Sequence, residues 1–329
     1  MSGYQGPTLR QMEYVLAVAR TGKFGEAARE CGVSQPALSK QIQEAEALAG
    51  GPLFERARPR ALLTVRGEAF VKRAKRVLDD ANMLVEAVQG CDHELGGELH
   101  LGVIPTIAPY LLPGLLGELR EAHPSLLLVL HEAYTDEIMT ALADGELDLV
   151  LLAMPIQEHR LVGEDLYEEP FSLLSPSGHR LAGTSRVKAK ELRDASLLLM
   201  DEGHCFRDQA LEVCALAGAH ERAQIRAASV STLVRMVEAG VGATLVPMLS
   251  LRGEAHGVSG LNIRFFDDDE VVSRRIGLRW RDSDPREEAF RSLAKTIRAH
   301  ARELSSKYVA LLGEDIPELT ILGDDGAGA

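Results

Sequence analysis

The 329-residue chain is poor in cysteine and lacks any stretch long and apolar enough to span a membrane. No run approaches the roughly 18–20 unbroken apolar residues of a transmembrane helix. The N-terminus, MSGYQGPTLRQ, lacks the basic-then-apolar pattern of a secretory signal. We therefore expect a cytoplasmic protein without a membrane partner. Structural disulfides are rare in that compartment, and a disulfide there more often acts as a signal.

The charge of the chain is unevenly distributed. The composition, with 46% hydrophobic and 26% charged residues, is that of an ordinary globular protein long enough for two or three domains. The net charge is −13, yet residues 1–76 contain 13 Lys/Arg against 7 Asp/Glu, a local charge of +6. A basic head on an acidic body suggests binding to nucleic acid.

The basic head has the pattern of a helix-turn-helix. Apolar residues recur at helical spacing over residues 8–20, and a second short helix fits FGEAARECG, which Gly32 ends. Ser34 is a good N-cap for a third helix, which continues through Pro36 to about Leu48. Two short helices joined by a tight turn place the second helix in the major groove of DNA.

The candidate DNA contacts lie on that second helix and on a following turn. The turn, in PLFERARPRALLTVRG, has the character of a wing whose arginines meet the phosphate backbone. A small helical domain with solvated charges is the alternative interpretation. The predicted DNA-binding residues are Ser34, Gln35, Pro36, Ser39, Lys40, Gln43, Arg56, Arg58 and Arg60.

The run VSQPALSKQIQEAEALAGGPLFER resembles the DNA-binding segment of LysR-type transcriptional regulators, with SQPALS and PLFER as its most specific pieces. It departs from the family at AEALAGG, a difference that should alter packing rather than the second helix of the helix-turn-helix, the reading helix that enters the major groove. The resemblance implies a winged helix-turn-helix domain at residues 1–65, a linker and dimerisation helix with a hinge at 66–93, and an effector domain at 94–329.

The predicted linker helix carries one apolar stripe about 25 residues long. Its apolar residues are three or four positions apart from Phe70 to Val88, and such a helix needs a partner surface. Its length favours pairing with a second chain over packing on its own body. The pattern fades before Gly96 and Gly97, which mark a hinge, and nearby Cys91 is expected to be a bystander.

The acidic body alternates strands with helices from Gly97 onward, which predicts an open, mostly parallel α/β sheet. The pattern fits two subdomains, the first at about 94–166 and 272–306 and the second at about 167–271, with a ligand cleft between them. LysR-type effector domains resemble periplasmic binding proteins, in agreement with this plan. The acidic tail at 307–329 is expected to be partly disordered.

The segment GHCFRDQALEVC at 203–214 holds two of the four cysteines, Cys205 and Cys214. A zinc site usually needs cysteines two to four residues apart and four ligands, whereas only His204 is near. A static disulfide is disfavoured by the compartment. Inert buried cysteines and a redox pair both remain open at this point.

Helical geometry makes the redox interpretation testable. If a helix began near Cys205, Cys214 would lie on roughly the opposite face and about 13 Å along the axis. A disulfide needs Cα atoms within about 7 Å, so oxidation would have to unwind the segment. A helix start and Arg207 would favour the Cys205 thiolate, with His204 bonding the sulfur or reactant and Asp208 holding Arg207.

The same segment resembles the sensing region of the peroxide-responsive members of the LysR-type family, in the core GHCxxDQ and the second cysteine. The resemblance implies that Cys205 is the peroxidatic cysteine and Cys214 the resolving one. It extends to IPTIAPYLLP and LHEAYTDE, where Thr106 and Thr135 correspond to hydroxyl residues of the peroxide pocket; strand-end capping is the alternative. In RRIGL, Arg274 or Arg275 matches the family's supporting basic residue, with the register ambiguous by one.

We interpret the chain as a DNA-binding transcriptional regulator that senses hydrogen peroxide through a reversible disulfide of Cys205 and Cys214. We expect no enzymatic activity, cofactor or metal site. The implied partners are promoter DNA, RNA polymerase, a thioredoxin or glutaredoxin system as reductant, and further copies in a homotetramer. Two rivals are a LysR-type regulator that binds a small organic effector in the cleft and a thiol peroxidase.

Overall fold

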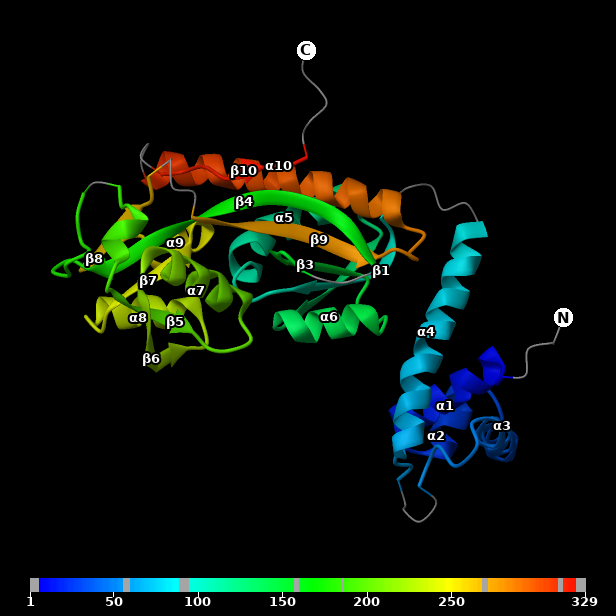
Figure 1. Cartoon of the computed structure of the whole chain (residues 1–329). Helices are drawn as coiled ribbons and strands as arrows, with labels where there is room; N and C mark the ends of the chain where they lie inside the picture. The colour runs from blue at the N-terminus through cyan, green and yellow to red at the C-terminus, as the bar shows by residue number, and fades with distance from the viewer. Residues whose placement is uncertain are drawn as a thin grey trace. The chain divides into compact units, whose positions relative to one another are not determined.

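A computed structural model describes residues 6–55, 60–88, 95–156, 160–184, 186–267, 272–312 and 316–323. The chain divides into two compact units, Met1–Asp92 and His93–Ala329 (Figure 1). Over the ranges described, the helices are too short or too polar to cross a bilayer.

The N-terminal unit contains the helices predicted from the sequence. They are α1 (Leu9–Thr21), α2 (Phe24–Glu30), α3 (Gln35–Leu48) and α4 (Val65–Val88). Thr8 caps α1 in a reciprocal capping box with Gln11, and the Ser34 side chain accepts the Ala37 N–H at the start of α3. Gly32 has φ +67° in the turn between α2 and α3, a conformation that glycine adopts without strain. Local capping therefore explains where these helices begin and end.

The segment after α3 forms the predicted wing. Phe54 and Leu63 make an antiparallel bridge, and the buried Glu46 carboxylate accepts the N–H groups of Leu53 and Phe54. This carboxylate fixes the base of the wing to the reading helix. Arg56 and Arg58 lie outside the described residues, and Arg60 is exposed.

The second unit consists of two α/β subdomains. The first contains β1 (Gly97–Val103), α5 (Ala108–Ala122), β2 (Leu126–Glu132), α6 (Thr135–Ala143), β3 (Leu149–Met154) and α10 (Glu287–Leu312). The second contains β5 (Ser196–Met200), α7 (Cys205–Ala217), β6 (His220–Ala227), α8 (Val230–Glu238), β7 (Ala243–Pro247) and β8 (Leu261–Phe265), with short helices η1 (Ala189–Leu192), η2 (Met248–Ser250) and α9 (Leu251–Glu254).

Two long strands, β4 (Leu161–Pro176) and β9 (Ser273–Arg281), join the subdomains (Figure 1). The strand order is β2-β1-β3-β9-β4-β7-β5-β6, with β8 and β10 (Thr320–Ile321) paired to β4. The expectation of a mostly parallel sheet is wrong, because β9 is antiparallel to both β3 and β4, and β4 is antiparallel to β7 and β8. The chain leaves the first subdomain along β4 and returns along β9, so parallel pairing is confined to the strands within each subdomain.

Part of the acidic tail packs against the regulatory unit. Helix α10 continues to Leu312, and β10 (Thr320–Ile321) pairs antiparallel with β4. Ile316 and Leu319 are buried. The acidic and glycine-containing composition of the tail concealed the apolar residues of IPELTIL, whose burial stabilises the segment against the sheet.

Candidate redox site

The predicted site residues follow strands whose carboxyl ends meet between the subdomains. Thr106 follows β1, Thr135 begins α6 after β2, and Cys205 begins α7 after β5. The carboxyl ends of parallel strands are where ligands of open α/β folds bind. The topology therefore brings segments about 100 positions apart to the region between the two subdomains.

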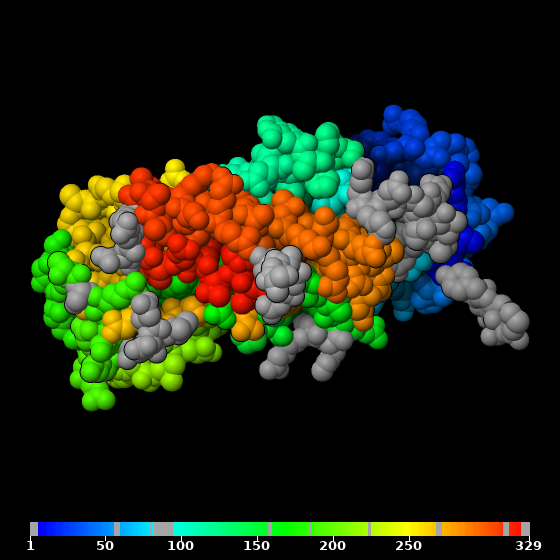
Figure 2. Space-filling view, turned by 90° about the horizontal axis from the view of Figure 1, so that it is seen from above, coloured from blue at the N-terminus to red at the C-terminus, as the bar shows by residue number. Residues whose placement is uncertain are grey.

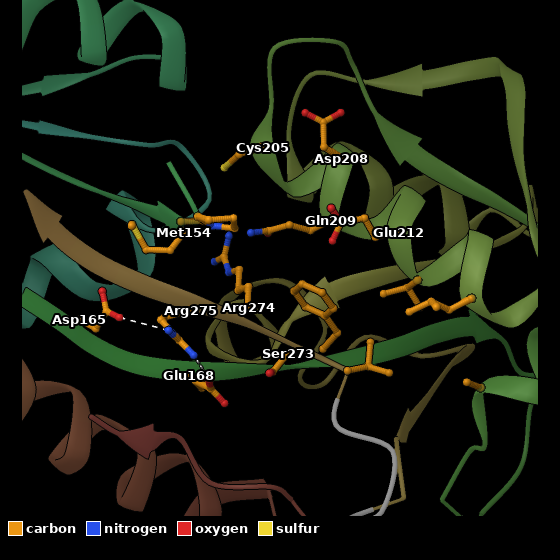
Figure 3. Close-up of a pocket in the computed structure, with 17 residues that line it drawn as sticks. Met154, Asp165, Glu168, Cys205, Asp208, Gln209, Glu212, Ser273, Arg274 and Arg275 are labelled. Carbon is orange, nitrogen blue, oxygen red and sulfur yellow. Dashed lines mark hydrogen bonds and ion pairs between the residues drawn. The ribbon is translucent and has the colours of Figure 1, made fainter. Parts of the chain in front are cut away.

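Cys205 is a half-buried free thiol at the first helical position of α7. It borders a cavity of about 810 Å³ between α7, β3, β4 and β9. In Figure 3, Cys205 and Gln209 face Arg274 across this cavity, with Met154 beside them. The first backbone N–H groups of a helix lack intrahelical partners and favour negative charge, which suits a thiolate at this position.

Cys214 lies on the same unbroken helix and is a buried free thiol. Nine residues of α-helix separate the two cysteines by about 13 Å along the axis, beyond the Cα distance of about 7 Å that a disulfide tolerates. Burial raises the pKa of Cys214 to about 11, so this sulfur is a thiol at neutral pH. The fold therefore keeps the two sulfurs apart. Cys31 is also free, and Cys91 lies outside the described residues.

The two neighbours of Cys205 are held by residues from the opposite subdomain and the crossing strands. The His204 ring packs edge-on against Tyr134 at 4.5 Å between centroids. The Arg274 guanidinium lies 5.7 Å from the centre of the Phe206 ring. Tyr134 immediately precedes Thr135, so these contacts bring the start of α6 beside the start of α7.

Arg274 is the centre of a buried polar network. It pairs with Glu169 at 2.8 Å, and both side chains are 1% exposed. Its Nη1 donates to Thr106 Oγ1 at 2.7 Å and its Nη2 to the Thr106 carbonyl at 2.9 Å. Arg275 points to the other face of β9, where its half-exposed side chain pairs with Asp165 and Glu168 (Figure 3). Strand alternation thus assigns the network to Arg274 and removes the one-residue ambiguity of register.

Four polar atoms near the start of α7 are buried and have no hydrogen-bond partner among the described residues: Thr135 Oγ1, His204 Nε2, Arg207 Nε and Gln209 Oε1. Burial lowers the pKa of His204, which keeps the imidazole neutral at neutral pH. Buried polar atoms are rarely left unsatisfied, and such exceptions are typical of binding sites. Gln209 was not among the predicted site residues, although it is part of the GHCxxDQ signature.

Asp208 does not hold Arg207 in place as the sequence predicted. Arg207 pairs with Glu221 on β6, where its Nη2 donates to both carboxylate oxygens at 3.0 and 3.2 Å. Asp208 is 3.9 Å from Arg207 and largely exposed, so Glu221, not Asp208, is the main anchor of Arg207. Arg207 therefore ties the first turn of α7 to the sheet. Of the predicted site residues, Cys205, Asp208 and Arg274 line the cavity, whereas Thr106, Thr135, His204 and Arg207 are not among its lining residues.

Glu221→Gln should loosen the start of α7. The substitution leaves the largely buried Arg207 without its charged partner, at a cost of about 1–3 kcal/mol. We expect faster amide hydrogen exchange in the first two turns of α7, by about 5- to 100-fold. Glu238→Gln, which breaks the exposed Arg235–Glu238 pair on α8, is the control and should leave exchange in α7 unchanged. Equal protection of α7 in both variants would contradict the anchoring role.

The predicted DNA contacts lie on the accessible side of α3. Ser34, Gln35, Pro36, Lys40 and Gln43 are exposed and Ser39 is half-buried, while Leu38 and Ile42 pack into the core of the unit. A groove beside α3 is lined by Gln35, Ser39 and Gln43. Over the same described ranges, His, Cys, Asp and Glu side chains form no group of three able to hold a metal ion.

A helix-turn-helix unit followed by a two-lobed α/β domain is typical of bacterial transcriptional regulators that bind DNA with one domain and sense a signal with the other. Residues 9–68 match the model described as "Bacterial regulatory helix-turn-helix protein, lysR family", and residues 92–302 match "LysR substrate binding domain". The chain belongs to the LysR family.

Relatives within that family include proteins named as peroxide-inducible activators. A "Probable hydrogen peroxide-inducible genes activator" of Streptomyces viridosporus is 40% identical over 92% of this chain and 97% of its own length. The Escherichia coli "DNA-binding transcriptional dual regulator OxyR" is 36% identical over 88% and 95%.

Solved structures of OxyR proteins are also similar to this chain. A full-length OxyR variant from Pseudomonas aeruginosa matches with a TM-score of 0.72 at 34% identity, over 89% of this chain and 98% of that one. An H2O2-bound OxyR mutant of Corynebacterium glutamicum matches at 0.67 and 32%, over 95% and 99%. These likenesses confirm the predicted architecture of a DNA-binding helix-turn-helix domain and a two-lobed α/β regulatory domain.

Proposed function

We propose that this protein is an OxyR-type transcriptional regulator in which hydrogen peroxide oxidises Cys205 and Cys214 to a reversible disulfide. The observation that carries the proposal is the placement of both thiols on one intact helix: Cys205 borders the cleft, while Cys214 is buried about 13 Å further along the axis. The chemistry therefore cannot finish without a change of shape. The likeness to peroxide-inducible regulators supports this assignment.

The oxidation proceeds in two steps. The Cys205 thiolate attacks one oxygen of the peroxide, so an S–O bond forms, the O–O bond breaks and water leaves after protonation. The Cys214 thiol then attacks the sulfenic sulfur, an S–S bond forms and a second water leaves. Two thiols are oxidised by two electrons and one peroxide is reduced to two waters.

The polar groups around Cys205 suit a small peroxide. Thr106 Oγ1 accepts a hydrogen bond from Arg274, which leaves its own proton free to donate. Thr135 Oγ1 can donate or accept, and neutral His204 offers Nε2. These groups can hold the peroxide and stabilise the departing oxygen without a metal ligand.

The second step requires α7 to unwind, which makes α7 the two-state element of the switch. The refolded segment changes the pairing of subunits and hence the contacts with promoter DNA and RNA polymerase in a homotetramer. Each cycle ends in a disulfide, so a dithiol reductant of the thioredoxin or glutaredoxin class must reset the protein. The reaction is accordingly a signal, not turnover by an enzyme, and it proceeds without a cofactor.

Lys40→Ala should weaken binding to promoter and non-promoter DNA alike. The exposed ammonium on α3 is placed to neutralise one phosphate, and that contact carries no sequence information. The slope of log K against log salt should become shallower by about 0.9. Salt titrations of fluorescently labelled duplexes measure it, with Lys295→Ala on the exposed face of α10 as the control. A Lys40→Ala slope equal to wild type would exclude a phosphate contact.

A promoter footprint of the thiol-reduced and peroxide-treated protein tests the proposed function. We expect the protected region to change on oxidation and to return after addition of a dithiol reductant. A footprint that peroxide does not alter would overturn the proposal.

A further inference from the structure

A chain of buried hydrogen bonds connects the C-terminal helix with the peroxide site. The Tyr308 hydroxyl on α10 donates to the carbonyl of Leu249 in η2, and the Leu249 N–H donates to Glu169 Oε1 at 2.8 Å. Glu169 Oε2 accepts from Arg274 Nε at 2.9 Å. Arg274 in turn donates to Thr106. The relay thus runs from Tyr308 through Leu249, Glu169 and Arg274 to Thr106.

Every member of the relay is buried. Relative exposures are 3% for Tyr308, 2% for Leu249, 1% for Glu169, 3% for Arg274 and 2% for Thr106. Burial raises the pKa of Tyr308 to about 12, so its hydroxyl remains a donor at neutral pH. Hydrogen bonds away from water are strong and costly to leave unmade, so each link restricts the position of the next.

The segment 316–323 contacts the two elements that carry Tyr308 and Glu169, namely helix α10 and strand β4. The Leu319 N–H donates to Ser305 Oγ, one turn before Tyr308 on α10. Strand β10 pairs Thr320 with Glu168 and Ile321 with Tyr167, next to Glu169 on β4. Figure 1 shows β10 alongside α10 and β4, and Figure 2 shows the red C-terminal segment packed against the orange helix.

We propose that Tyr308 is a positioning residue for the peroxide reaction, and that the segment 316–323 holds Tyr308 and β4 in register for this role. The inference rests on the proposed oxidation of Cys205 by peroxide. Tyr308 fixes η2, η2 fixes the Glu169 carboxylate, and Glu169 fixes the guanidinium that orients Thr106.

The reaction with peroxide depends on the orientation of the Thr106 hydroxyl group. A hydroxyl has one proton, and accepting from Arg274 directs that proton away from the guanidinium. If the relay relaxes, Arg274 no longer holds Thr106 in one arrangement. The reaction with peroxide then slows, whereas a thiol reagent that needs no hydroxyl donor reacts as before.

Tyr308→Phe in the full-length reduced protein removes only the donor. The second-order rate constants of Cys205 with hydrogen peroxide and with iodoacetamide are measured by quantifying the modified Cys205 peptide by mass spectrometry. We expect the peroxide rate to fall about tenfold, the equivalent of one lost hydrogen bond in the transition state. The iodoacetamide rate should stay within about twofold, because alkylation bypasses Thr106.

Tyr167→Phe is the matched control. Tyr167 is also fully buried, on β4 two residues from Glu169, but its hydroxyl has no hydrogen-bond partner among the described residues. Its removal should leave both rates at wild-type values. An equal loss of peroxide rate in Tyr167→Phe and Tyr308→Phe would reduce the effect to general packing and overturn the proposal.

A double-mutant cycle tests whether the effect passes through Thr106. In a Thr106→Val background, Tyr308→Phe should cause no further loss of peroxide rate, since the group that it positions is absent. A full additional tenfold loss would overturn the relay. If wild-type Cys205 itself fails to react with peroxide, the proposed function and this inference both fall; if wild type reacts and Tyr308→Phe matches it, only this inference does.

Discussion

Cys205→Ser will show no peroxide-dependent change in promoter footprint. In Cys214→Ser, peroxide will still oxidise the Cys205 thiol, but no intramolecular disulfide will form. The serine oxygen is not ionised at neutral pH and cannot attack a peroxide, so no sulfenic acid forms. In Cys214→Ser the first step is intact, because Cys214 is buried and protonated in the intact helix. The two variants therefore separate oxidation from the change of shape.

The measurement combines footprinting with a dimedone probe for sulfenic acid. Dimedone should label Cys214→Ser after peroxide and should not label position 205 in Cys205→Ser. Cys31→Ser, which removes a half-buried thiol of the DNA-binding unit, is the control and should behave as wild type. A Cys205→Ser footprint that still shifts with peroxide would exclude the thiol switch, and a shift caused only by a small organic molecule would favour a conventional cleft effector.

Arg274→Met will destabilise the regulatory unit by about 3–5 kcal/mol, because it leaves the buried Glu169 carboxylate without its partner. The neighbouring Arg275→Met removes an exposed pair that solvent screens, and the expected cost is within about 1 kcal/mol. The two substitutions are chemically identical and one residue apart. The difference between them therefore reports burial and pairing alone.

Urea unfolding of both full-length variants, followed by the fluorescence of the single tryptophan, Trp280, measures this difference. Trp280 is fully buried on the same strand, β9, and so reports the regulatory unit. Equal destabilisation by the two substitutions would show that Glu169 tolerates the loss of Arg274. The Glu169→Gln, Arg274→Met double variant should recover part of the loss, since it removes the stranded charge as well.

The elements that local chemistry defines were predictable from the sequence. The caps Thr8 and Ser34, the turn at Gly32 and the helix beginning at Cys205 all lie where residue preferences place them. The share of parallel strand pairing was overestimated, because an apolar pattern indicates burial but not strand direction. Strand β9 is apolar like β3, yet the two strands are antiparallel. The pairing of β10 with β4 was not predicted, because the few apolar residues of that segment are surrounded by acidic ones.

The sequence predicts the helix that carries the two cysteines but not the contacts that support the site. The roles of Cys205, Cys214, Thr106 and Thr135 rest on the resemblance and stay predictions. Glu169, Glu221 and Tyr308 lie 14 to 105 positions from the residues they hold within the site network, and pairings over such distances leave no local pattern in one sequence. Strand alternation, visible only once the register of β9 is known, distinguished Arg274 from Arg275.

In the proposed switch, one peroxide joins two cysteines that the intact helix α7 keeps apart. The direct measurement is a disulfide map by peptide mass spectrometry after one equivalent of hydrogen peroxide. The predicted result is a Cys205–Cys214 bond, with Cys31 and Cys91 still free. A bond that includes Cys31 or Cys91, or a fully reduced Cys214 after Cys205 has reacted, would contradict the account.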